Sequence, residues 1–136
     1  MNKTAIAFLS KDRVELSRRT IQPLLPRTSG NAFDIWWLDG SSTEEGMSFP
    51  KGFSFVGTPK ELHHIAEVRG GPDAAVAYAL TTLLAKGYSY IGLIENDVLF
   101  TDPDWFEQTM ALFARGRDDG PRIAAHGAVA VVRAQA

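Results

Sequence analysis

Two carboxylates and an amide interrupt an otherwise apolar stretch in the second half of the chain. The run Tyr90–Ile94 ends in Glu95-Asn96-Asp97, and a second apolar triplet, Val98–Phe100, follows directly. Residues i and i+2 of an extended segment point to the same side, so Glu95 and Asp97 are predicted to lie together. Two like charges placed together repel unless a cation lies between them or one is protonated. Because hard oxygen ligands favour Mg²⁺ or Mn²⁺, Glu95 and Asp97 are candidate metal ligands, and helix capping by Asp97 is the competing interpretation.

Polar residues also follow two other predicted strands. The apolar run Ala5–Leu9 is followed by Ser10-Lys11-Asp12, and the aromatic-rich run Phe33–Leu38 is followed by Asp39. Ligands of open α/β sheets bind outside the carboxyl ends of the strands. We therefore expect Ser10, Asp39 and the Glu95 motif to converge on one crevice. The alternatives are a helix cap for Ser10 and a simple turn residue for Asp39.

The elements that must position these residues alternate along the chain. Helical patterns are predicted over 14–25, 71–87 and 105–114, and further strands over 52–57 and 122–133. Residues 43–51 form a segment of low hydrophobicity, and residues 59–69 are interpreted as a loop with one helical turn. This order predicts an α/β domain of three layers, with a mainly parallel, Rossmann-like sheet flanked by helices.

Individual residues indicate where the helices begin and end. Ser10 or Asp12 is a candidate cap for the first helix. Gly71 is expected to cap the second predicted helix, with Pro72 at its first position and Gly87 just beyond its end. The adjacent pair His63-His64 is interpreted as a surface pair rather than a metal site.

The composition limits the classes of function. The chain has 136 residues, 45% of them hydrophobic, a net charge of −2 and no cysteine. Thiolate metal sites and disulfides are excluded, and the lack of a basic block argues against nucleic acid as a ligand. No apolar run approaches the ~20 residues that span a bilayer, and the N-terminus is a poor signal peptide, so we expect a cytoplasmic protein without a transmembrane segment. The apolar run near the C-terminus favours a chain cut from a longer one.

The order of these motifs resembles that of nucleotide-sugar-dependent glycosyltransferases of the GT-A fold, especially the family-two-like members. Four segments carry the resemblance, namely IAFLSKDRVELSRRTIQPLL, IWWLDGSST, RGGPDAAVAYALTTLLAKGYSYIGLIENDVLF and DPDWFEQTM. Together they extend from Thr4 to about Val132. The chain departs from the family at its Asp-x-Asp motif, where Glu95 replaces the first Asp and its longer arm changes the geometry.

The resemblance implies that residues 1–136 form a single nucleotide-sugar-binding domain that lacks the acceptor-binding half and its catalytic base. It implies sugar transfer from a nucleotide-sugar donor to a saccharide, lipid or protein acceptor. Glu95 and Asp97 would hold Mn²⁺ or Mg²⁺, and Ser10, Asp39 and Asn96 would bind the donor. The alternatives are an inactive GT-A-like nucleotide-binding module and a receiver-like domain that binds Mg²⁺ to accept a phosphoryl group. The receiver-like class is disfavoured because no lysine follows Lys86.

Overall fold

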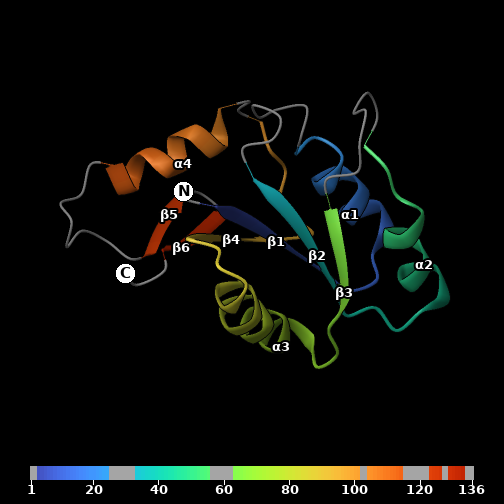
Figure 1. The fold of residues 1–136 in the computed structure, drawn as a ribbon. Helices are drawn as coiled ribbons and strands as arrows, with labels where there is room; N and C mark the ends of the chain where they lie inside the picture. The colour runs from blue at the N-terminus through green and yellow to red at the C-terminus, as the bar shows by residue number, and fades with distance from the viewer. Residues whose placement is uncertain are drawn as a thin grey trace.

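A six-stranded sheet forms the centre of the molecule (Figure 1). The computed structural model describes residues 3–24, 33–55, 63–101, 104–114, 123–126 and 129–133. The strands are β1 (Thr4–Ser10), β2 (Asp34–Asp39), β3 (His63–Glu67), β4 (Tyr90–Glu95), β5 (Ile123–His126) and β6 (Val129–Arg133). Their order in the sheet is β3-β2-β1-β4-β6-β5. The first four strands are parallel, and β6 and β5 add antiparallel pairs beside β4, so the predicted mainly parallel α/β sheet is confirmed.

Helices cover both faces of this sheet, which confirms the three layers. They are α1 (Val14–Ile21), α2 (Glu44–Gly52), α3 (Gly71–Tyr78), which continues as a π-helical turn η1 (Ala79–Leu83), and α4 (Trp105–Ala114). In Figure 1, α3 lies on one side of the sheet and α4 on the other. None of the helices in the described ranges is long and apolar enough to cross a membrane.

The side chains of β1 alternate between two separate cores. Ile6 and Phe8 join a core with the aromatic residues of α4, whereas Ala5, Ala7 and Leu9 pack in a second core that contains residues of α3 and η1. This alternation is the two-residue period of a strand that is covered on both faces. It explains why the sequence of β1 is apolar throughout.

The segment from 43 to 69 differs from the sequence-based prediction. Most of the segment of low hydrophobicity belongs to helix α2, whose N-cap Thr43 accepts a hydrogen bond from the backbone N–H of Gly46. Residues 53–55 are not a strand, and residues 56–57 lie outside the described ranges. The alternation there arises because Phe53 and Phe55 pack against each other and against the imidazole of His63.

The third strand is β3, in the stretch interpreted as a loop with one helical turn, so that interpretation was wrong. Its two histidines lie on opposite faces of the sheet. His63 is buried among aromatic rings, including Trp37, while His64 is exposed and stacks on Trp36 at 4.5 Å between ring centroids. The interpretation as a surface pair therefore fails for His63, because adjacent residues of a strand point in opposite directions.

The helix caps also differ from the prediction. The N-cap of α1 is Arg13 in the left-handed conformation, without a side-chain cap, so neither Ser10 nor Asp12 caps this helix. The N-cap of α3 is Gly70 rather than Gly71. Gly87, with φ of 94°, has the left-handed conformation expected of the residue after a helix.

Candidate functional site

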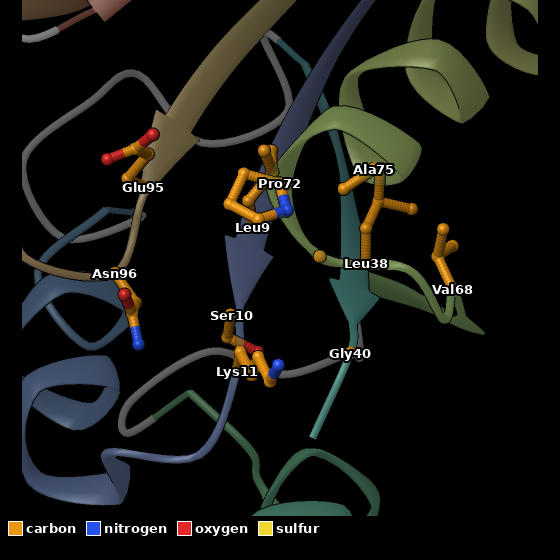
Figure 2. Close-up of a pocket in the computed structure, with 11 residues that line it drawn as sticks. Leu9, Ser10, Lys11, Leu38, Gly40, Val68, Pro72, Ala75, Glu95 and Asn96 are labelled. Carbon is orange, nitrogen blue, oxygen red and sulfur yellow. The ribbon is translucent and has the colours of Figure 1, made fainter. Parts of the chain in front are cut away.

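A cavity of about 110 Å³ opens at the carboxyl edge of the parallel strands. It is bounded by the ends of β1, β2 and β4, by the residue that follows β3, and by the first turns of α3 (Figure 2). The described residues that line it are Leu9, Ser10, Lys11, Leu38, Gly40, Val68, Gly71, Pro72, Ala75, Glu95 and Asn96. The cavity is therefore where the sheet topology predicts a ligand.

The wall of the cavity has an apolar part and a charged part. Leu38, Val68 and Ala75 belong to the core on the α3 side of the sheet. Glu95 and Asn96 lie on the other side of the cavity in Figure 2, with Lys11 between the two groups. Such a site can hold a flat, weakly polar group against the apolar wall while a charged group of the same ligand meets the polar wall.

Ser10 and Asp39 meet in a buried hydrogen-bond network on the other face of the sheet. The indole N–H of Trp37 donates to Ser10 Oγ at 2.7 Å, and Ser10 Oγ donates to Asp39 Oδ1 at 3.3 Å. Asp39 Oδ1 also accepts from Ser41 Oγ at 2.6 Å and from the Ser41 backbone N–H at 3.1 Å. Asp39 is only 2% exposed and does not line the cavity, whereas Ser10 does. The structure thus brings these two sequence-predicted residues together, with Oδ1 of Asp39 engaged in organising the turn after β2.

Asp12 joins the loop after β1 to the start of α2. Its carboxylate accepts hydrogen bonds from the backbone N–H and hydroxyl groups of Ser42 and Thr43, at distances from 2.6 to 3.4 Å. Its own backbone N–H donates to Ser41 Oγ at 2.7 Å. The hydrogen bonds from Thr43, followed by those from Ser42, lower the pKa of Asp12 to about 2. Gly46 is required beside this contact, because a Cβ there would lie 2.4 Å from Asp12 Oδ1.

Side chains of helix α1 hold the motif Glu95-Asn96-Asp97 in place through hydrogen bonds. Thr20, 1% exposed, has its hydroxyl 3.0 Å from the carbonyl oxygen of Asn96 and 2.7 Å from that of Val98. The side-chain amide of Asn96 donates to Ser17 Oγ at 3.0 Å. These contacts fix the backbone of the motif against the helix.

The motif is not extended throughout. Glu95 is the last residue of β4, and Asn96 and Asp97 form a turn. The alternation argument that placed Glu95 and Asp97 on one side therefore applies only up to Glu95. Both carboxylates are exposed, and Glu95 and Asn96 line the cavity whereas Asp97 does not.

The donor set can be compared with what a divalent cation requires. In the described part of the chain, no three His, Cys, Asp or Glu side chains gather as a metal site. Mg²⁺-type sites at substrate phosphates, however, use one or two protein carboxylates, with the phosphates completing the coordination. Two exposed carboxylates, one at the end of β4 and one in the turn that follows, fit that kind of site, and they do not fit a closed site made by protein ligands alone.

Comparison with known proteins supports the fold. No protein-family model and no curated sequence matches the chain. A protein from Desulfovibrio desulfuricans G20, assigned as a nucleotide-diphospho-sugar transferase, is similar with a TM-score of 0.64 and 13% identity, over 98% of this chain and 64% of that protein. The mannosyltransferase PcManGT from Pyrobaculum calidifontis, solved with GDP-Man and Mn²⁺, is similar with a TM-score of 0.69 and 12% identity, over 96% of this chain and 44% of that protein.

The fold is GT-A-like. This confirms, at the level of the fold, the resemblance to nucleotide-sugar transferases that the motifs indicate. The chain spans less than two thirds of the length of either protein.

The sequence did not point to several residues that organise this GT-A-like site. Ser17 and Thr20 fall within the helix predicted over 14–25, where two small hydroxyl residues three apart on one face of an amphipathic helix are only a weak signal of a polar contact. Lys11 belongs to the polar group Ser10-Lys11-Asp12 that is expected at this edge of the sheet, but no role of its own follows from the sequence. Its position directly after a buried strand was the available signal.

Proposed function

We propose that this chain binds the nucleotide-sugar donor of a glycosyltransferase and supplies the donor half of the sugar-transfer site. The observation that carries the proposal is the cavity, which lies across the carboxyl ends of β1, β2 and β4 in a GT-A-like fold. The similarity to a mannosyltransferase solved with GDP-Man and Mn²⁺ supports the same class of ligand.

The two parts of the cavity suit the two ends of a nucleotide. The nucleobase would lie against the apolar wall of Leu38, Val68 and Ala75, where burial of its faces is favourable. The diphosphate would then extend toward Asn96 and Glu95 at the end of β4. In this arrangement Asp39, which is buried outside the cavity lining, would act on the site through the hydrogen bonds that its Oδ1 accepts from Ser10 and Ser41.

Glu95 and Asp97 are the residues that would hold a divalent cation at the diphosphate. When bound there, Mn²⁺ or Mg²⁺ neutralises the negative charge that grows on the departing nucleotide. The contribution of the chain itself is to fix the motif: Thr20 and Ser17 hold the backbone and the amide of Asn96 in place. Preorganisation of this kind lowers the free energy that must be spent on ordering the site when the donor binds.

A calorimetric titration tests the proposal. GDP, UDP and their mannose and glucose conjugates are titrated with Mn²⁺, with Mg²⁺ and with EDTA. We expect at least one nucleoside diphosphate to bind more tightly with the metal, and Asp97→Ala to remove that enhancement. Asp73→Ala is the matched control, because Asp73 is an exposed carboxylate in the first turn of α3 that does not line the cavity. Equal affinity with metal and with EDTA would refute the role of the metal, and no binding by any nucleotide would refute the proposed function.

A further inference from the structure

We propose that Lys11 is the residue that binds the diphosphate of the donor by direct charge contact, which makes it a specificity determinant for diphosphates over uncharged nucleosides. This inference rests on the proposed function. Lys11 lines the cavity, and it carries the only positive charge among the described residues that do so. In the described ranges no carboxylate forms an ion pair with it, whereas Lys51 and Arg69 are both paired with Glu67.

The backbone around Lys11 is fixed on both sides. On its N-terminal side, Ser10 accepts from Trp37 and donates to Asp39. On its C-terminal side, Asp12 is bound through its N–H and through its carboxylate to the residues that begin α2. Only the flexible side chain of Lys11 remains to be ordered when an anion binds. Less free energy is then lost on binding than for a lysine on a mobile loop.

The shape of the loop places Lys11 at the cavity. Asp12 and Arg13 both have left-handed backbone conformations, with φ of 52° and 49°, so the chain turns sharply directly after Lys11. This conformation is uncommon for residues other than glycine, and the hydrogen bonds of the Asp12 carboxylate offset its energetic cost. Asp12 is thus a positioning residue for Lys11.

The charges of the cavity wall favour this assignment. Glu95 lines the same cavity and would repel a diphosphate. A cation on the wall between Glu95 and the apolar side offsets the negative charge of Glu95 where the phosphates must pass. Removing the lysine charge should therefore weaken the binding of nucleoside diphosphates selectively and leave the apolar contacts of the nucleobase unchanged.

The test compares Lys11→Met with Lys3→Met. Both substitutions remove one positive charge from an exposed lysine, but Lys3 precedes β1 and Lys11 follows it. Eight residues of extended chain separate them by roughly 26 Å, well beyond the ~10 Å Debye length at 0.1 M salt. Titrations use GDP and UDP and, as uncharged probes, guanosine and uridine, all in EDTA so that the protein's own charges are measured. Circular dichroism and melting temperature confirm that each variant is folded.

We expect Lys11→Met to weaken binding of the nucleoside diphosphate that the wild-type chain prefers by about 10-fold, to leave the matching nucleoside unchanged, and to flatten the salt dependence. Lys3→Met should match the wild type, and Lys11→Arg should retain most of the affinity. Equal effects of Lys11→Met on diphosphate and nucleoside, or no effect on either, would overturn the inference while wild-type binding left the proposed function intact. A wild-type chain that bound no nucleotide either in EDTA or with Mn²⁺ would refute both.

Discussion

Replacement of Thr20 by valine tests whether helix α1 holds the motif at the end of β4. Valine has nearly the shape of threonine, so Thr20→Val removes the hydroxyl and leaves the packing nearly unchanged. The hydroxyl has a single proton, which it shares between the carbonyl oxygens of Asn96 and Val98 at 3.0 and 2.7 Å. Without the hydroxyl, the partly buried carbonyl oxygens of Asn96 and Val98 lose their hydrogen-bond donor on α1.

The expected destabilisation follows from the geometry. One shared hydrogen bond of good length contributes about 0.5–1.5 kcal/mol, and leaving partly buried acceptors without a donor adds to that, so we expect about 1–2 kcal/mol. For a chain of this length the melting temperature should fall by about 4 °C per kcal/mol, or about 4–8 °C in total. If the loss is local to the turn, the same free energy should raise its opening equilibrium about 5- to 30-fold.

Hydrogen exchange measured by mass spectrometry distinguishes a local effect from a general one. Peptides that cover Glu95 to Val98 should exchange faster in Thr20→Val, while peptides from β1 should change only as much as global stability requires. Thr20→Ser is the matched control: it keeps the hydroxyl and loses a methyl group, so it should lower stability without selectively exposing the turn. Equal exchange of the turn in both variants would refute the idea that the Thr20 hydroxyl fixes the motif.

Two further predictions concern the hydrogen bonds of Asp39 and Asp12. Asp39→Asn should lower the free energy of unfolding by about 1–3 kcal/mol, because the hydrogen bonds from Ser41 to Oδ1 would no longer be made to a charged acceptor. A parallel loss of nucleotide affinity would show that Asp39 acts on the donor site. Unchanged affinity would leave Asp39 as a turn residue only. The pKa of Asp12 is lowered from 3.8 to about 2, chiefly by hydrogen bonds from Thr43, so its stabilising effect is present above pH 3.8 and is lost as the pH falls through about 2. The difference in melting temperature between the wild type and Asp12→Asn should therefore be largest near neutral pH and shrink between about pH 4 and pH 2, and a difference that does not change with pH would contradict this origin.

Much of the fold could be predicted because strong local patterns coincide with tertiary burial. The apolar runs that became β1, β2 and β4 are buried on both faces, and the stripe of α4 was predicted with its observed bounds. The failures lie between 43 and 69, where α2 contains Gly46, Pro50 and Gly52, residue types with a low propensity for helix. There the decisive contacts are tertiary: the rings of Phe53 and Phe55 pack around a buried His63. No local pattern distinguishes such packing from the alternation of a strand.

The candidate site could be predicted only as far as the sheet edge on which it lies. The face of the sheet to which each side chain points depends on the strand register, and no local sequence pattern determines that register. Ser10 pairs with Asp39, so both point into the network with Trp37, whereas Glu95 pairs with Leu9 and points toward the α3 side. β1 ends at Ser10, one residue beyond Leu9, which is the partner of Glu95. Lys11, the residue directly after β1, lines the cavity together with Glu95, whereas Asp39 is buried and does not line it.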